Sequence, residues 1–338
     1  MADSFFFHLM LIVFYLHTTD AQTGACFGFI SSNLPPPADV IALCKQHNIQ
    51  RLRIYDPNPQ VLQALGGSNV SVIVGVPNEE ITGIAQDPNL AKSWVQNNVL
   101  KYPNVNFRYI SVGNEIDPDG GAGSSSSIAS SLAPAMQNVY DALTAAGFGQ
   151  KVKVSTALSM GVLGSSYPPS RGLFRSPSFV GPIVSFLSRT RGPFLVNVYP
   201  YLAYTSDPSD ILLDYAMFAS PMAVVNDGKY EYRNLFSAMV DAVHAALENA
   251  GAAADLEVVV SETGWPSAGG TAATIENAKT YNSNLLKMVK SGTPRKAGKP
   301  VEAYIFDLID ENEKEPETEK HWGIFLPNKQ PKYPLSFD

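Results

Sequence analysis

The chain has 338 residues, of which 45% are hydrophobic and 16% are charged, and its formal net charge is −7. This apolar fraction excludes a largely disordered chain, and the acidic balance argues against a nucleic-acid binder, which usually has a basic face. The charged fraction is below the average of about 25%. The composition therefore does not favour an ionic ligand over a neutral one.

The first element is a short apolar run at residues 5–16, followed by polar residues and Ala21. The run is shorter than a membrane span of about 20 residues and has the length of a signal-peptide core, about 7–15 residues. We expect residues 1–21 to be removed as a signal peptide, with a buried N-terminal helix or strand as the alternative. No second long apolar run follows, so we expect no membrane anchor.

The two cysteines, Cys26 and Cys44, are too few for a disulfide framework. Both lie in apolar stretches and are interpreted as small buried hydrophobic residues, although a bridge between them stays open. Asn69-Val70-Ser71 is an N-glycosylation sequon in a turn, and its occupancy also stays open.

Short β-branched or aromatic runs recur eight times along the chain, separated by helix-like segments such as 37–47, 128–145 and 235–250. The predicted strands are residues 26–30, 51–55, 70–76, 108–112, 152–158, 194–199, 257–261 and 303–308. This alternation calls for a parallel sheet covered by helices. Eight repeats predict a single closed (β/α)8 TIM barrel over residues 22–338, with its active-site groove at the C-terminal ends of the strands.

An open doubly wound sheet is the alternative, and it makes its own sequence prediction. A dinucleotide-binding sheet places a G-x-G-x-x-G turn after its first strand, whereas this chain continues as Ser31-Ser32-Asn33. No Walker-type phosphate loop occurs either. The Gly/Ser-rich tract at 120–127 is interpreted as a loop before a helix.

Catalytic groups of a barrel project from the C-terminal ends of its strands, so the residues that follow each predicted strand are the candidates for catalysis. The fourth strand leads into Asn114-Glu115, and the seventh leads into Glu262. A single glutamate in such a place is more often part of a structural ion pair. Two of them, at strands four and seven, favour a catalytic pair.

Two facing carboxyl groups suit glycoside hydrolysis. A retaining mechanism needs a nucleophile and an acid/base about 5–5.5 Å apart. Like charges this close raise one of the two pKa values, so one group holds a proton while the other stays ionised.

Several motifs resemble those of plant endo-1,3-β-glucanases of glycoside hydrolase family 17, across essentially the whole mature chain. They include GACFG at 24–28, RIYD at 53–56, VGNE at 112–115, NVYPY at 197–201, SETGWPS at 261–267 and DENEK at 310–314. VGNE alone is a weak signal, whereas SETGWPS at this distance from it, with NVYPY between, is specific. The resemblance implies Glu262 as nucleophile and Glu115 as acid/base, in agreement with the strand-end argument.

The resemblance also implies residues that bind the substrate. Glu311, Lys314 and Glu319 match a Glu, a Lys and a Glu of the family after strand eight, and the alternative for these residues is a solvated run of charge. Asn114 is expected to donate to the 2-hydroxyl of a sugar, and Asn197 is a similar polar candidate.

Neutral sugars stack on aromatic faces, so we expect an aromatic groove beside the acids. The candidates are Tyr55, Tyr199, Tyr201, Phe306 and Trp322. The five histidines show no metal-ligand spacing, and we expect neither a metal nor a cofactor.

The chain departs from the family pattern after Phe306, where Asp307 and Ile309 replace small and aromatic residues. A carboxyl group at Asp307 can shift nearby pKa values if it faces the groove. Alternation along a strand predicts that it points away from the side that Phe306 takes.

These observations predict a secreted, extracellular, retaining endo-hydrolase of 1,3-β-glucans such as callose, laminarin or fungal wall glucan, acting as a monomer on a neutral polysaccharide. The chain stops at Asp338, so we expect no vacuolar or membrane-anchoring extension. One alternative is a hydrolase of mixed 1,3-1,4-linked glucan, and another is a glucan-binding wall protein with little turnover.

Overall fold

The computed structural model describes residues 23–120 and 126–337. The predicted signal peptide and most of the Gly/Ser-rich tract lie outside these residues. In the described part, eight strands close into a barrel in the order β1-β12-β11-β8-β5-β4-β3-β2, and neighbouring strands are parallel. The predicted (β/α)8 barrel is confirmed.

Each predicted strand corresponds to one strand of the barrel. In chain order these are β1 Thr23–Phe27, β2 Arg51–Ile54, β3 Ser71–Val76, β4 Asn106–Asn114, β5 Lys153–Ser159, β8 Phe194–Asn197, β11 Val258–Thr263 and β12 Ala303–Ile305. All eight are mostly buried, as expected for a parallel sheet covered on its outer face.

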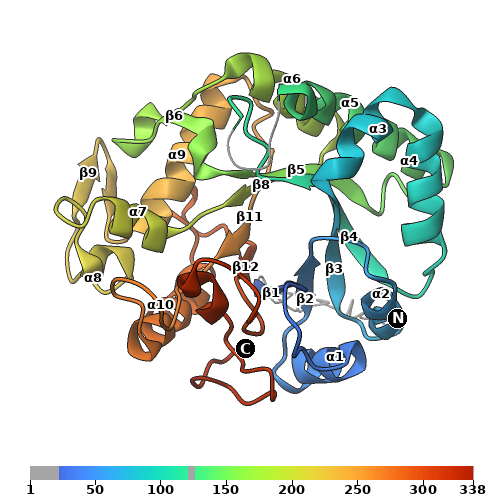
Figure 1. Cartoon of the computed structure of the whole chain (residues 1–338). Coiled ribbons are helices and arrows are strands. Elements are labelled where there is room, and N and C mark those ends of the chain that lie inside the picture. The colour runs from blue at the N-terminus through green and yellow to red at the C-terminus, as the bar shows by residue number, and fades with distance from the viewer. Residues whose placement is uncertain (1–22, 121–125, 338) are drawn as a thin grey trace, which may run out of the picture.

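Helices surround the strands in Figure 1 and follow them in the sequence. They are α1 Pro37–Gln46, α2 Pro59–Leu65, α3 Ile81–Gln86, α4 Pro88–Val95, α5 Ser126–Ala145, α6 Pro177–Thr190, α7 Pro200–Ser206, α8 Leu213–Ala216, α9 Leu235–Asn249 and α10 Ile275–Met288. Side chains cap several of their N-termini, as Asn234 does for α9 by accepting from the Ser237 N–H. None of the helices in the described residues combines the length and apolar composition that crossing a bilayer requires.

The loops of the described barrel contain two small antiparallel hairpins that were not predicted from the sequence. One pairs β6 Leu163–Ser165 with β7 Leu173–Phe174 after β5. The other pairs β9 Val225–Asp227 with β10 Tyr230–Tyr232 after α8. Strands this short lack the run of alternating residues by which a strand is identified from sequence.

Strand β1 begins three residues earlier than predicted, because its start is defined by pairing and not by composition. Thr23 and Gly24 pair with Ala303 and Tyr304 of β12. A Cβ at Gly24 would lie 2.7 Å from the Tyr304 ring, so the close packing here requires glycine. Residues 28–30, predicted as strand, instead line the groove described below.

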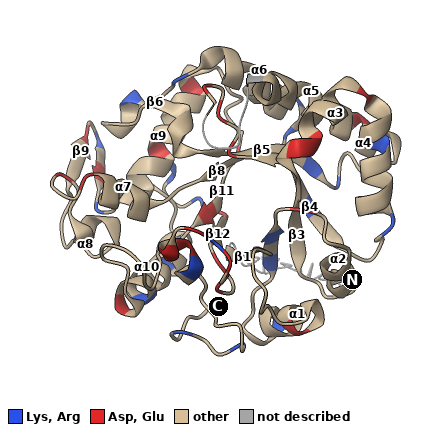
Figure 2. Cartoon of the chain, in the orientation of Figure 1, with Lys and Arg blue, Asp and Glu red and all other residues tan. Residues whose placement is uncertain are grey.

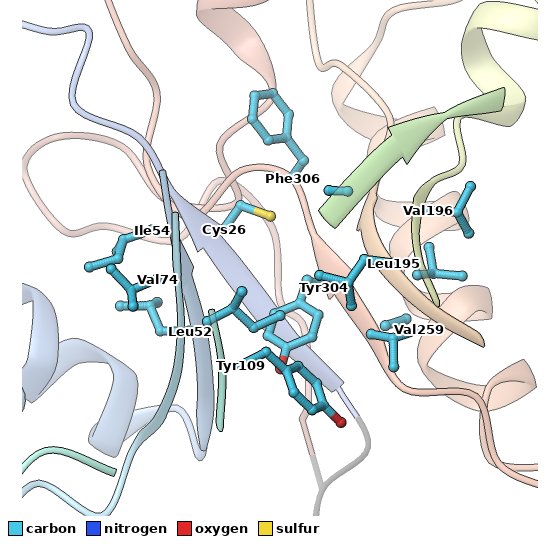
Figure 3. Packing of buried hydrophobic residues seen from close by; sticks show 14 of the residues in the cluster. Cys26, Leu52, Ile54, Val74, Tyr109, Leu195, Val196, Val259, Tyr304 and Phe306 are labelled. Carbon is cyan, nitrogen blue, oxygen red and sulfur yellow. The ribbon is translucent and has the colours of Figure 1, made fainter. Parts of the chain in front are cut away.

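Alternation along the strands separates an inner from an outer set of side chains. In Figure 3, Ile54 and Val74 lie on the outer side of β2 and β3, whereas Cys26 and Tyr304 point into the space between the strands. Arg53, between Leu52 and Ile54, therefore points inward. Both cysteines are buried and unbridged, as expected for small hydrophobic residues.

A charged cluster closes the end of the barrel at which the strands begin. Glu302 lies directly before β12 and pairs with Arg51 at 3.0 Å and with Arg108 Nε at 2.8 Å. It also accepts a hydrogen bond from the Tyr304 hydroxyl at 2.8 Å. One buried carboxylate thereby pairs with guanidinium groups from two strands, β2 and β4.

We expect Glu302→Ala to destabilise the fold by about 3 kcal/mol, because it leaves Arg51 buried without its carboxylate. Thermal unfolding should show the loss. Glu302→Gln keeps the volume and one acceptor and should cost less. Because the cluster lies at the opposite end from the groove, activity measured well below the melting temperature should be unchanged, and a loss of activity in the folded variant would contradict this assignment.

Candidate active site

An open groove of about 580 Å³ lies at the ends of the strands where the candidate residues were predicted. Tyr55, Asn114, Glu262, Phe306, Glu311 and Lys314 all line it. They follow or end strands β2, β4, β11 and β12, which are far apart in the sequence. Closing the barrel is what brings them to one surface.

Glu262 is held by three donors at the end of β11 and is only 5% exposed. Its Oε1 accepts from the Tyr55 hydroxyl at 2.9 Å and lies 2.9 Å from Arg53 Nη1. Its Oε2 accepts from the Tyr199 hydroxyl at 2.6 Å. Burial raises the pKa of both tyrosines, so their hydroxyl groups remain protonated donors. These three contacts fix the orientation of the Glu262 carboxyl group.

Glu115 follows β4 with a backbone conformation that non-glycine residues rarely adopt, at φ 53°. Its N–H donates to the carbonyl of Ala157 on β5 at 2.8 Å, which holds the turn in place. The carboxyl Oε1 accepts from Asn197 Nδ2 at 2.9 Å. Glu115 is an exposed residue, but partial desolvation by the surrounding protein, together with the Glu262 charge, raises the pKa of its carboxyl group.

Arg53 connects the two glutamates, although the sequence analysis assigned it no role. It is 1% exposed. Its Nη1 donates to Asn197 Oδ1 at 3.0 Å and its Nη2 to Asn114 Oδ1 at 2.7 Å. Burial lowers the pKa of Arg53, but the surrounding groups that raise it, with Glu262 first among them, together outweigh burial, and the pKa lies above its ordinary value. A signal for this role was present, since an arginine inside a barrel strand must be paired.

Two asparagines complete the network. Asn197, 1% exposed at the end of β8, donates to Glu115 and accepts from Arg53 and from the Ser261 hydroxyl. The structure thus places Asn197 behind Glu115 and not on the groove surface. Asn114 does line the groove, and because its Oδ1 accepts from Arg53, its amide N–H groups are oriented to donate elsewhere.

Aromatic rings pack edge to face along one wall. Phe306 lies 6.5 Å from Tyr55, 6.1 Å from Tyr199 and 5.8 Å from Trp322 between ring centroids. Tyr201 packs behind Trp322 at 5.5 Å and is buried. All five predicted aromatics therefore belong to one set of ring contacts, in which Trp322 is buried as well as Tyr201.

The charged residues after β12 also approach the groove. Lys314 Nζ lies 2.6 Å from Glu311 Oε2 and 4.3 Å from the centroid of the Phe306 ring. Glu319, at the 3-10 turn Glu317–His321, accepts from Trp322 Nε1 at 3.2 Å. Glu311 and Lys314 are largely buried and paired, which argues against a solvated run of charge at these two positions.

The arrangement offers two carboxyl groups in unlike environments. Glu262 has a guanidinium and two phenols as partners, whereas Glu115 has one amide and a raised pKa. One group is suited to attack as a carboxylate, and the other to donate a proton. Acid/base assignments in enzymes commonly follow such a separation of environments.

Known proteins resemble this chain along almost its whole length. The sequence model of the glycosyl hydrolases family 17 matches residues 23–337. The tomato (Solanum lycopersicum) glucan endo-1,3-beta-glucosidase B is 50% identical and covers 97% of this chain and 91% of its own length. The basic vacuolar isoform GLB of glucan endo-1,3-beta-glucosidase from Nicotiana tabacum is 51% identical, covering 97% and 89%.

A solved structure gives the same result in three dimensions. CJP38, a beta-1,3-glucanase and allergen of Cryptomeria japonica pollen, superposes with a TM-score of 0.89 at 44% sequence identity, covering 94% of this chain and 99% of its own. The family match spans nearly all described residues, and the relatives agree in sequence and in fold. The chain therefore belongs to family 17 of the glycosyl hydrolases and is a glycoside hydrolase.

Proposed function

We propose that this glycoside hydrolase cleaves internal 1,3-β-glucosidic bonds of neutral 1,3-β-glucans, such as callose, laminarin and fungal wall glucan, with retention of configuration. The observation that carries the proposal is the pair of glutamates on one hydrogen-bonded network at the groove, Glu262 through Arg53 and Glu115 through Asn197. The names of the relatives support the linkage. An open groove suits cleavage within a long chain.

In the proposed mechanism, Glu262 attacks the anomeric carbon while Glu115 protonates the departing glycosidic oxygen. Tyr55, Tyr199 and Arg53 orient the carboxylate and compensate its charge. This transfer leaves Glu115 as a carboxylate. Because the negative charge of Glu262 is gone in the glycosyl-enzyme, the pKa of Glu115 falls and the carboxylate stays ionised. Glu115 then takes a proton from water, which attacks the anomeric carbon and frees Glu262.

Substrate binding in this proposal combines ring stacking with hydrogen bonds. Phe306 offers an apolar surface to the groove, and Lys314 and Glu311 lie beside it. Asn114 is placed to donate from its amide to the 2-hydroxyl at the cleavage site. We further propose that residues 1–21 direct the protein into the secretory pathway and that it acts outside the cell.

Product analysis on linear, branched and mixed-linkage glucans tests the proposed activity. We expect release of reducing ends from laminarin and linear 1,3-β-glucan, as oligosaccharides of several lengths, and little release from 1,3-1,4-β-glucan. Preferred cleavage of the mixed-linkage polymer would replace the proposal with that specificity. Binding of laminarin without any release of sugar would instead indicate a glucan-binding protein.

Replacing either glutamate should separate their roles. Glu262→Gln should lower kcat on laminarin by about 10⁴-fold or more, because an amide cannot attack. Glu115→Gln should lower it by about 10²–10⁴-fold. Since the acid form of Glu115 is the active one and its pKa is raised, kcat/KM of the unmodified enzyme should fall as pH rises through that pKa.

The exposed Glu276 on α10 provides the control, because Glu276→Gln lies outside the groove and should leave kcat and its pH dependence unchanged. Circular dichroism should show that all three variants are folded. Substantial turnover by folded Glu262→Gln would overturn the assignment of the nucleophile.

The anomer formed first reports the stereochemistry. Two displacements at the same carbon restore the starting configuration, so proton NMR of early products should show the β-anomer before mutarotation. An initial α-anomer would mean a single displacement by water. Glu262 would then act as a base and not as a nucleophile.

A further inference from the structure

Asp307 is a buried carboxyl group that the proposed mechanism does not use. It follows Phe306 after β12 and is 2% exposed. Its N–H donates to the Trp322 carbonyl at 3.0 Å, and its Oδ1 accepts from the Leu308 N–H at 2.6 Å. Its Oδ2 is also buried, and among the described residues it has no hydrogen-bond partner. Such an oxygen is costly unless a donor reaches it.

Glu311 is a second buried carboxyl group that interacts with Asp307. It is also 2% exposed, and its Oε1 accepts from the Ile30 N–H at 2.7 Å. The backbone packs closely on it, since a Cβ at Gly28 would lie 2.4 Å from Oε1. The Asp307 and Glu311 carboxyl groups lie within hydrogen-bonding reach of each other, and Lys314 interacts electrostatically with both. In Figure 2 the loop after β12 carries acidic and basic residues side by side.

The charges in this cluster do not balance if both carboxyl groups are ionised. One ammonium group, Lys314, would then face two buried carboxylates, whose oxygens can only accept hydrogen bonds. A single proton held between Asp307 and Glu311 removes the excess charge and supplies the missing donor. Carboxyl pairs elsewhere share a proton for the same reason.

The other titratable groups near Asp307 do not supply this compensation. Cys26 on β1 is a neutral thiol, because burial raises its pKa well above the ordinary value. Lys332, in the C-terminal segment, pairs with Asp310 at 2.6 Å. Glu319 adds a further negative charge near Lys314.

We propose that Asp307 and Glu311 share one proton, and that this acid pair positions Lys314 and Glu311 on the groove wall for glucan binding. Asp307 is thus a positioning residue, and this role rests on the proposed function. Loss of the proton at alkaline pH gives Lys314 a second carboxylate to neutralise and draws its ammonium group away from the sugar. The effect falls on KM and not on the acid/base chemistry of Glu115.

Kinetics against pH test the proposal with Asp307→Asn, whose amide donates to Glu311 at every pH. In the unmodified enzyme KM for laminarin should rise about tenfold towards alkaline pH, the scale expected for a lost charge-assisted hydrogen bond. In Asp307→Asn KM should stay flat, while the fall of kcat remains. Asp310→Asn, on the same loop but paired with Lys332, is the matched control and should keep the KM rise. A KM that is flat in the unmodified enzyme, or that rises equally in Asp307→Asn, would overturn the proposal.

Infrared spectroscopy tests the shared proton without turnover. In Glu115→Gln, which removes the catalytic acid from the spectrum, a protonated carboxyl band should be present at neutral pH and vanish on alkaline titration. The band should be missing when Asp307→Asn is added. If that double variant does not fold, the titration of Glu115→Gln alone is the test. Absence of the protonated carboxyl band at neutral pH would then refute the acid pair. Failure of the proposed function would show separately, as no glucan hydrolysis by the unmodified enzyme at any pH.

Discussion

A guanidinium buried inside the barrel holds the groove together, because the residues it contacts are the residues of the site. Arg53 pairs with Glu262 and donates to Asn114 and Asn197. Burying a lone carboxylate costs several kcal/mol, and burying a lone guanidinium costs a similar amount. When the Glu262 carboxylate and the Arg53 guanidinium are paired, and each oxygen of Glu262 has a partner, the two groups compensate each other's cost of burial. The orientation of Glu262 is therefore set by Arg53 inside the barrel, together with Tyr55 and Tyr199 just after β2 and β8.

The same network also makes the two glutamates chemically different. Glu262 receives hydrogen bonds from two phenols and a charge from Arg53, whereas Glu115 receives one amide hydrogen bond through Asn197. The charge of Glu262 then acts on Glu115 and raises its pKa. Two residues of the same type thus have unlike electrostatic surroundings within one set of contacts, which is what the proposed division into acid and nucleophile requires.

Local patterns in the sequence predicted the barrel and the two acids, but not what holds the acids in place. Buried parallel strands appear as β-branched runs, so all eight were identified, and the barrel rule then located Glu115 and Glu262. Arg53 lies 144 positions from Asn197 in the chain, and no pattern within a strand specifies that pairing. The same limit explains why Asn197 was predicted to bind substrate. Its motif placed it at the end of β8, but only the closed barrel shows that its side-chain amide already bonds Glu115 and Arg53.

Asp307 raises the same question of buried charge balance as Arg53, on the other wall of the groove. Around Glu262 the buried charges are one carboxylate and one guanidinium, and they balance. Around Lys314 there are two buried carboxyl groups for one ammonium, so the balance depends on a proton instead of a second cation. A fixed cation keeps its charge across the working pH range, but a shared proton does not. In this proposal, sugar binding at the wall with Lys314 depends on pH through the shared proton, whereas the pairing of Glu262 with Arg53 does not.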